Sequence, residues 1–189
     1  MDPRPTETPV SGDSPAPKKR RLRARFAYLA YLLILRAELP FFMPIRRKLV
    51  NVMLGRRHIG LMVYPDVYIS DYRNIVLGDH VSINRGSHLS GAGGITIGNK
   101  VAIGHATTIL SSEHGFKDPS IPICDQPLTL SPVEIGDDVW LGARVCILAG
   151  VKISNGTVVA AGAVVTKSTA GEGSIIGGVP ARLLKHRSE

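Results

Sequence analysis

A repeat of six residues constrains the fold of this chain more than any other feature of its sequence. Six hexapeptides follow one another without an insertion from Ile135 to Ala170, and two further blocks in the same phase begin at Leu77 and Ile97. The twelve first positions are all Leu, Ile or Val, and the fifth positions are mostly small or β-branched, with Glu113 as the one charged residue. A strict aliphatic period of six predicts a solenoid, not an alternation of helices and strands.

The length of the repeat has a physical explanation. A short extended run turns its first residue inward, and a small second residue lets the chain bend at a corner before the next run. Three runs close one triangular coil, and successive coils stack as parallel β-strands about 4.8 Å apart. Stacking buries a ladder of aliphatic side chains that no single repeat could bury alone. Twelve hexapeptides predict about four coils.

The repeat resembles the left-handed parallel β-helix of the hexapeptide-repeat acyltransferases, which implies an all-β fold. The handedness rests on the resemblance, because the general preference for right-handed crossovers predicts the opposite. Over residues 75–186, the motifs IGDDVW-LGA, GAVVTK and GGVPAR are similar to those of the maltose/galactoside O-acetyltransferase branch. The resemblance implies a homotrimer that uses acetyl-CoA as co-substrate and needs no metal ion.

Composition divides the chain into three parts. We expect a disordered basic tail at residues 1–25, an N-terminal helical segment at 26–60 and a β-helix domain at 61–189. The first seventeen residues are rich in Pro, Ser, Thr and Asp and lack the apolar content needed to fold. Within the β-helix domain, four prolines interrupt the ladder at 115–132 and predict an extended loop. The segment that follows Pro180 is expected to form a short C-terminal helix.

The N-terminal segment joins a basic cluster to a short apolar run. Six of the eight residues from Lys18 to Arg25 are Lys or Arg, and the ten residues at 26–35, FAYLAYLLIL, are apolar. Ten residues are too few for a helix to cross a bilayer. Such a helix can lie on an anionic membrane surface, as a peripheral contact, or it can cap one end of the solenoid. A similar leader precedes the repeats of capsule and exopolysaccharide acetyltransferases.

Charge and cysteine content narrow the classes of partner. The formal net charge is +8, and residues 1–25 contribute half of it with seven basic and three acidic residues. The remaining surplus is compatible with an anionic ligand such as a phosphorylated cofactor and does not call for nucleic acid. Cys124 and Cys146 form no disulfide framework and no metal-ligand spacing. A cytoplasmic location is the simplest interpretation. Peripheral contact with the inner face of the membrane stays open.

His114 lies at the root of the extended loop, in the sequence SSEHGF. A histidine beside a loop is more often a solvated residue than a catalyst, but the maltose/galactoside branch holds its catalytic histidine at the same place. The resemblance therefore implies that His114 is a general base, which draws the proton from an acceptor hydroxyl while the oxygen attacks the thioester of acetyl-CoA. An imidazole suits this task because its ordinary pKa lies near neutrality. Glu113 is adjacent, and its role stays open.

Two further residues are expected at the acceptor. Asn84 matches the acceptor-side asparagine of galactoside acetyltransferase-like proteins, although an asparagine at a β-helix corner is also an ordinary turn residue. Trp140, the only tryptophan, matches the Trp of the family's VW-[IL]-G motif and would line the pantetheine or acceptor pocket. It could equally pack between subunits, and the two roles are compatible.

The resemblance also implies a set of contacts to acetyl-CoA. Two alanines would contact the pantetheine through their backbone, a Thr-Lys pair would follow, and two basic residues near the C-terminus would bind the CoA phosphates. These cofactor-binding positions are Ala143, Ala161, Thr166, Lys167, Arg182 and Lys185.

The chain departs from the family pattern at two places. Ser112 stands where several relatives carry a second histidine, and residues 91–94 read Gly-Ala-Gly-Gly where galactoside acetyltransferase is acidic. Acceptor specificity therefore does not transfer from the family.

Together these features predict an acetyl-CoA-dependent O-acetyltransferase that acts on a hydroxyl of a sugar or polysaccharide precursor. An N-acyltransferase of an amino sugar differs only in its acceptor and stays open. A zinc β-helix of the γ-carbonic anhydrase type is less favoured, because the six histidines show no close pair at metal-ligand spacing. A non-catalytic scaffold would be recognised by loss of the catalytic histidine or of the loop, and the chain keeps both.

Overall fold

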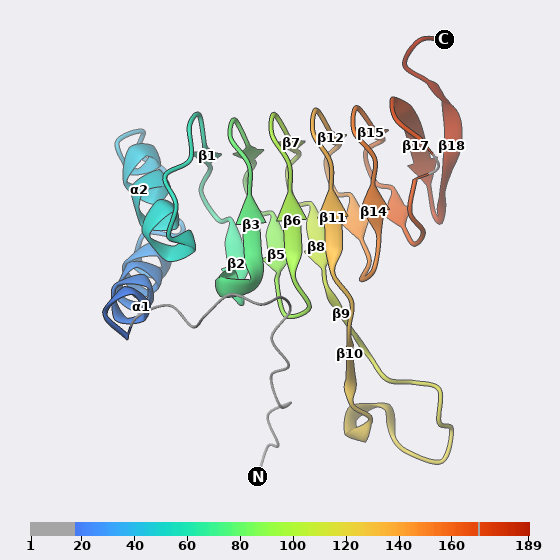
Figure 1. Ribbon diagram of the computed structural model, residues 1–189, viewed down its shortest axis with the longest axis horizontal. Coiled ribbons are helices and arrows are strands. Elements are labelled where there is room, and N and C mark those ends of the chain that lie inside the picture. The colour runs from blue at the N-terminus through green and yellow to red at the C-terminus, as the bar shows by residue number, and fades with distance from the viewer. Residues whose placement is uncertain (1–17, 170) are drawn as a thin grey trace.

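The computed structural model describes residues 18–169 and 171–189 and shows a prism of stacked β-strands (Figure 1). Three sheets, here called sheets I, II and III, form the faces of the prism, and their strands are parallel apart from the last pair of sheet I. The predicted parallel β-helix is therefore confirmed. The disorder expected for residues 1–17 lies outside the described residues.

The three sheets differ in the number of strands. Sheet I is formed by β1 (Met62–Val63), β4 (Ser82–Ile83), β7 (Ala102–Ile103), β12 (Trp140–Leu141), β15 (Val158–Val159), β17 (Ser174–Gly178) and β18 (Ala181–His186). Sheet II is formed by β2 (Tyr68–Ser70), β5 (His88–Ser90), β8 (Thr108–Leu110), β13 (Cys146–Ile147) and β16 (Val164–Val165). Sheet III is formed by β3 (Ile75–Leu77), β6 (Ile95–Ile97), β11 (Val133–Ile135) and β14 (Lys152–Ile153).

Each full coil adds one strand to each sheet, always in the order III, I, II. Equivalent positions of successive coils pair directly, as Ile75 pairs with Ile95 and Ile95 with Val133. The prism has about six turns, two more than predicted. The difference arises at both ends, because β1 and β2 form a coil before Leu77 without a clean hexapeptide and β17 begins another after Val165.

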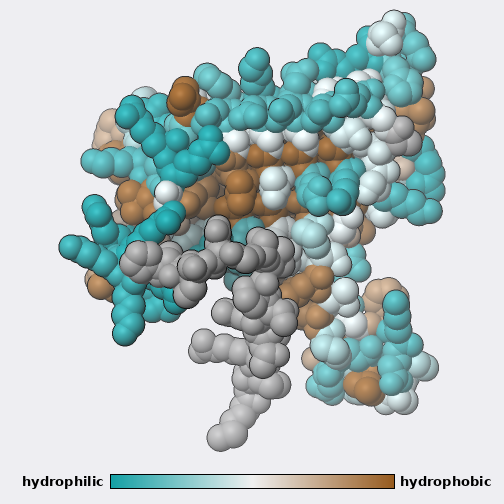
Figure 2. Space-filling model, in the orientation of Figure 1, coloured by the Kyte–Doolittle hydropathy of each residue, from teal (hydrophilic) through white to brown (hydrophobic). Residues whose placement is uncertain are grey.

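The aliphatic first positions form the core, as the repeat predicted. All twelve are buried, from Leu77 at 1% exposed to Val165 at 1% exposed. Ten of the twelve fifth positions are buried beside them, whereas Glu113 is exposed and Thr169 is half-buried. Each fully buried Leu, Ile or Val contributes roughly 1.5–3 kcal/mol relative to exposure, so this ladder is the main stabilising element. At the surface, Figure 2 shows a hydrophobic band that runs along one face of the prism.

The glycines at second positions are required by the close approach of successive coils. A Cβ built at Gly78 would lie 2.5 Å from the backbone of Gly98, and one at Gly104 would lie 2.6 Å from the backbone of Gly142. Real Cβ atoms do not approach backbone so closely, so a side chain here would push two coils apart. The predicted need for a small residue at this corner is explained by stacking distance.

A ladder of Asp and Asn side chains satisfies the backbone at the corner between sheets III and I. The Asn99 Oδ1 accepts a hydrogen bond from the backbone N–H of Asp79 at 2.9 Å, and Asp137 Oδ1 accepts one from Asn99 at 2.6 Å. Asn155 Oδ1 continues the series to the N–H of Asp137 at 2.8 Å. These third-position residues accept hydrogen bonds from backbone N–H groups that the bend leaves without a strand partner.

Two helices cover the N-terminal end of the prism, α1 (Lys18–Leu33) and α2 (Phe42–Leu54). The inner face of α1 places Ala24, Ala27 and Tyr31 in the core, and the Tyr31 hydroxyl donates to the carbonyl of Val67. The capping role is therefore confirmed. The boundary differs from the prediction, since α1 begins at Lys18 and includes the basic residues that had been assigned to a disordered tail. Lys and Arg have good helix propensity, and packing of the inner face of α1 on the core stabilises the helix.

A buried arginine fastens α2 to the first coil. Arg46 is 1% exposed and donates to the carbonyl of Ala37 and, at 3.4 Å, to that of Val63 in β1. Burial lowers the pKa of its guanidinium from the ordinary value.

A β-hairpin closes the C-terminal end, where the sequence predicted a short helix. Strand β18 pairs antiparallel with β17, and Arg187 beyond it donates to Asp138 at 2.8 Å and to the carbonyl of Gly156 at 3.1 Å. The prediction of a helix was wrong because an exposed strand edge at the end of sheet I offers backbone hydrogen bonds that outweigh local helix propensity.

Candidate active site

The extended loop leaves the prism as an arm, between sheet II and sheet III (Figure 1). Its base is a two-stranded ribbon of β9 (Ser112–His114) and β10 (Leu128–Leu130), and its tip contains one short helical turn, Ile123–Asp125. Residues 115–127 therefore form the loop proper, a narrower range than the predicted 115–132. His114 ends β9 opposite Leu128, and its side chain is exposed.

One buried glutamine organises the tip of the arm. Gln126 is 9% exposed, and its Nε2 donates to the carbonyls of Asp118 and Ile121, both at 2.8 Å. Its Oε1 accepts from the N–H of Asp118 at 3.3 Å. The Gly115 N–H donates to the Pro127 carbonyl at 3.1 Å and closes the base. The arm is thus an ordered element that holds His114 at a fixed place, not a slack linker.

The glycine-rich stretch at residues 91–94 lies directly beneath the root of the arm. The Ser111 Oγ donates to the Ser90 carbonyl at 2.7 Å and accepts from the Gly93 N–H at 2.9 Å. A Cβ at Gly93 would lie 2.1 Å from the Ser111 carbonyl oxygen and 2.8 Å from the Ser131 nitrogen. The departure from the family pattern at residues 91–94 therefore has a structural cause in this chain, because at position 93 only glycine leaves room for the two strands of the arm.

Four of the predicted site residues lie along the edge where sheet I turns into sheet II, here called the I–II edge. Asn84, Ala143 and Ala161 follow strands β4, β12 and β15 at equivalent corners. Arg182 pairs with Gly177 at the far end of β17, so it extends the same edge toward the C-terminus. Asn84 is half-buried, and its Nδ2 donates to the Ile103 carbonyl at 3.0 Å, which fixes the orientation of the amide.

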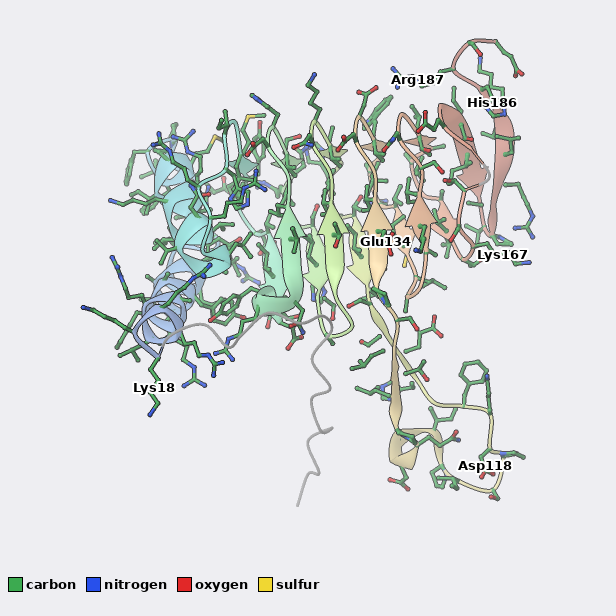
Figure 3. All side chains as sticks on the ribbon, viewed as in Figure 1. Lys18, Asp118, Glu134, Lys167, His186 and Arg187 are labelled. Atoms are coloured by element: carbon green, nitrogen blue, oxygen red, sulfur yellow. The ribbon has the colours of Figure 1, made fainter. Side chains whose placement is uncertain are left out.

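Three others lie along the opposite edge of sheet II, the II–III edge. His114 leaves it on the arm, and Thr166 and Lys167 follow β16 two coils further on. Figure 3 shows Lys167 on the side of the prism from which the arm with Asp118 departs. The Lys167 side chain is exposed.

The two remaining residues belong to sheet I. Trp140 points outward from β12 and is 57% exposed, between Ala102 on one neighbouring strand and Val158 on the other. Lys185 pairs with Ile175 on the outer strand β18. Neither lies on an edge of sheet II.

The predicted site is therefore divided within one chain. Asn84 and His114 are separated by the width of sheet II, which for the five or six residues between the edges is roughly 15–20 Å. Such a span exceeds any hydrogen bond and any small acceptor hydroxyl. The same division separates Arg182 from Lys167, although the resemblance implies that both contact acetyl-CoA.

Two polar residues on the I–II edge were not singled out from the sequence. Arg85 and His105 occupy the third hexapeptide position at this corner, the position that Ala143 and Ala161 hold in later coils. Both are exposed, and Arg85 forms an ion pair with Glu38 at 2.8 Å. The register of the repeat was the signal that could have found them.

The outward face of sheet II, between the two edges, carries titratable groups of another kind. The rings of Tyr68 and His88 meet edge to face, with centroids 5.0 Å apart. Burial lowers the pKa of His88 and raises the pKa of the Cys146 thiol. A thiol with a raised pKa is a poor nucleophile at neutral pH, so Cys146 is not suited to form an acyl-enzyme. Over residues 18–169 and 171–189, no group of His, Cys, Asp or Glu could hold a metal ion.

The stacked hexapeptide coils and the arm between two of them define a class of fold, the hexapeptide-repeat β-helices. The family described as "Bacterial transferase hexapeptide (six repeats)" matches residues 132–167. The resemblance to the hexapeptide-repeat acyltransferases that the sequence showed is thus confirmed, and a galactoside acetyltransferase of the suspected branch is among the similar structures.

Three known proteins illustrate the similarity. The chain is 38% identical over 118 residues to the putative lipopolysaccharide biosynthesis O-acetyl transferase WbbJ of Escherichia coli K12, and the match covers 59% of this chain and 60% of WbbJ. It thus spans less than two thirds of that relative. The hexapeptide-repeat acetyltransferase VCA0836 of Vibrio cholerae superposes with a TM-score of 0.75 at 29% identity, over 90% of this chain and 94% of that one. A galactoside acetyltransferase in complex with coenzyme A gives 0.71 at 25% identity, over 89% and 80%.

Proposed function

We propose that this protein transfers an acetyl group from acetyl-CoA to a hydroxyl of a sugar or polysaccharide precursor. The observation that carries the proposal is the position of His114, exposed on an ordered arm that leaves the II–III edge of a hexapeptide-repeat prism. The names of the relatives support the chemistry: WbbJ is a putative O-acetyl transferase of lipopolysaccharide biosynthesis, and VCA0836 has been solved with acetyl coenzyme A. Since acetyl-CoA is a cytoplasmic metabolite, we place the reaction in the cytoplasm.

The reaction we propose is a direct transfer. The neutral His114 ring accepts the proton of the acceptor hydroxyl as the hydroxyl oxygen forms a bond to the thioester carbonyl carbon. The carbon–sulfur bond then breaks, and the CoA thiolate takes the proton from the imidazolium, so that the products are the acetyl ester, CoA thiol and neutral His114. General base catalysis of this kind contributes about 10² to 10⁴ in rate. In this proposal the Asn84 amide orients the acceptor.

We further propose that the site is completed in a homotrimer, where the II–III edge of one copy faces the I–II edge of the next. That arrangement would bring His114, Thr166 and Lys167 opposite Asn84, Ala143, Ala161 and Arg182. The arm supports this reading, because five large apolar side chains on it are exposed and would be covered by a neighbouring copy. They are Phe116, Ile121, Ile123, Leu128 and Leu130.

The cofactor would lie along the same cleft. Backbone groups at Ala143 and Ala161 would contact the pantetheine, which needs small residues for close approach. Arg182 is exposed, and its guanidinium donates one hydrogen bond, to the Ala181 carbonyl at 3.0 Å. Its other N–H groups can therefore bind phosphate. Lys185, on the outer face of β18, would reach only the far end of the nucleotide. Trp140 would pack against a neighbouring copy or the acceptor.

A screen of the purified protein with acetyl-CoA tests the proposal. Candidate sugars and glycan precursors are incubated with the protein, and mass spectrometry detects the added acetyl group while thiol release gives the rate. Amino sugars in the same screen separate O-transfer from N-transfer. His114→Asn should abolish most transfer, whereas His80→Asn, a matched change at the corner between sheets III and I, should not. Wild-type turnover by His114→Asn would show that the assignment of the base is wrong.

A further inference from the structure

The N-terminal end of the prism carries nearly all of the excess charge. Residues 18–60 contain twelve Lys and Arg against one acidic residue, Glu38, whereas residues 61–189 contain ten Lys and Arg against eleven Asp and Glu. The ion pairs of this end engage Arg36, Arg56 and Glu38 with the solenoid. Within the described chain, none of the six basic residues of α1 forms an ion pair.

Helix α1 has two apolar faces, and only one of them is used by the fold. The inner face carries Ala24, Ala27 and Tyr31 in the core. On the outer face, four large apolar side chains recur at spacings of four, three and four residues and so form one stripe along the helix. Their exposed fractions are 55% for Leu22, 64% for Phe26, 57% for Leu29 and 88% for Leu33. At about 100° per residue, this stripe lies opposite the inner face.

Basic residues border the stripe on both sides. By the same helical geometry, Lys18 and Arg25 lie along one flank and Lys19 and Arg23 along the other. All four side chains are exposed, and in Figure 3 Lys18 points away from the prism. An apolar stripe with a cation on either side is the pattern of a helix that lies in the plane of a membrane interface.

A basic groove continues each flank onto the rest of the cap. A groove of about 1110 Å³ lies between α1, α2 and the loop that follows, and six of its thirteen lining residues are Lys or Arg. They are Arg20, Arg23, Arg47, Lys48, Arg56 and Arg57. On the other side of α1, a smaller hollow of about 240 Å³ is lined by Lys18, Arg21, Leu22, Arg25 and Arg73. Phosphate groups are the ligands that such clusters of guanidinium and ammonium groups favour.

We propose that this end of the prism is a docking surface for an anionic phospholipid bilayer. The stripe of α1 lies in the boundary between headgroups and acyl chains, and the flanking residues and grooves bind headgroup phosphates. No described helix is long and apolar enough to cross a membrane, so the contact is a surface contact. A second copy of this chain is a poor occupant, because two surfaces of the same strong positive charge repel each other.

The proposal joins the two interpretations that the sequence left open. Capping uses the inner face of α1, and membrane docking uses the opposite face, so one helix performs both tasks. The docking does not depend on acetyl transfer, and its test needs neither acetyl-CoA nor an acceptor.

Flotation of the full chain with vesicles tests the docking surface. We expect binding to phosphatidylcholine vesicles that contain phosphatidylglycerol, at least about tenfold tighter than to phosphatidylcholine alone and weakened by added salt. The double change Phe26→Ser with Leu29→Ser should weaken binding about tenfold or more while the circular dichroism spectrum stays unchanged. Leu184→Ser, which removes an equally exposed leucine at the other end of the prism, should have no effect on binding.

Two Lys→Gln variants distinguish binding by this surface from a general attraction of a basic protein to anionic vesicles. Lys19→Gln should weaken binding to the anionic vesicles about fivefold, the effect of one Lys near the surface, whereas Lys117→Gln on the arm should leave it unchanged. Equal binding to neutral and anionic vesicles, or full binding by the Phe26→Ser, Leu29→Ser chain, would overturn the proposal. If that chain instead changed its oligomeric state in light scattering without lipid, the stripe would be an interface between copies, and the proposal would be wrong.

Discussion

Asn84 and His114 lie on opposite edges of the same β-sheet, one at the turn that leads into sheet II and the other on the arm that leaves it. Both side chains are accessible, and neither can reach the other within one chain. A site that uses both therefore needs a second copy, and this geometry determines the first prediction.

We expect two inactive variants to restore each other. The two chains, His114→Asn and Asn84→Ala, are produced together so that they form mixed assemblies. A cleft between two copies is intact when the Asn84→Ala chain supplies its histidine and the His114→Asn chain supplies its asparagine. Random mixing makes about a quarter of the clefts intact. Thiol release from the mixed assembly should thus reach about a quarter of the wild-type rate. Mixing His114→Asn with Lys167→Ala, two changes on the same edge, should restore nothing. Activity no higher than that of the separate variants in the first mixture would place both residues in one chain.

Arg182 should govern affinity for acetyl-CoA and not the chemical step. Its guanidinium would bind phosphate equally in the ground state and the transition state, and such uniform binding changes KM without changing kcat. Arg182→Ala should raise the KM for acetyl-CoA by roughly 10- to 100-fold, which corresponds to about 1.5–3 kcal/mol. The deficit should shrink with acetyl-pantetheine as donor. Lys117→Ala serves as the charge-matched control. A loss of kcat at saturating acetyl-CoA with KM unchanged would contradict the cofactor placement.

Gly93→Ala should damage the root of the arm. The new Cβ would meet the Ser111 carbonyl at 2.1 Å, and backbone cannot yield as a flexible side chain does. We expect a loss of about 2–3 kcal/mol in the free energy of unfolding, measured by urea titration, together with a lower kcat because His114 shifts with the arm. Gly173→Asn is the control, since nothing lies within 4 Å of a Cβ there and Asn tolerates the φ of 65°. Wild-type stability of Gly93→Ala would show that the coils separate at little cost.

The stability of the N-terminal cap should fall in mild acid through His58. This residue is 4% exposed, its Nδ1 lies 2.8 Å from Asn51 Oδ1, and burial lowers its pKa. The unfolded chain binds the proton near the ordinary value of about 6.5, before the folded chain does. The stability that His58 contributes is therefore fully present above about pH 6.5 and is lost as the pH falls through the lower pKa of His58 in the folded chain.

Urea unfolding at about pH 7.5 and about pH 5.5 measures this effect. His58→Gln should reduce the difference in unfolding free energy between the two conditions, whereas His80→Asn, at an exposed corner, should keep it. An unchanged difference in His58→Gln would assign the acid sensitivity to other groups, of which His88 is the first candidate because burial lowers its pKa as well.

The hexapeptide phase was enough to predict the β-helix, the buried first positions and the place where the arm leaves. These features repeat with a local period, so each coil imposes the same requirement on its own six residues, and neighbouring coils reinforce it. Even the glycines of the corners follow, because the spacing between coils is constant. The roles of His114, Asn84, Trp140 and the CoA-binding positions rest on the resemblance and stay predictions.

Only the tertiary structure decided what happens at the ends and edges of the prism. Lys18–Arg25 are helical because the inner face of α1 packs on the core of the prism. The residues after Pro180 form a strand because the edge of sheet I has unpaired backbone groups with which they pair. The division of the site between two edges also escapes the sequence, since it depends on which of three corners each residue occupies once the interrupted coils are counted. Local period determines which side chains point inward, whereas position around the triangle depends on the whole folded path.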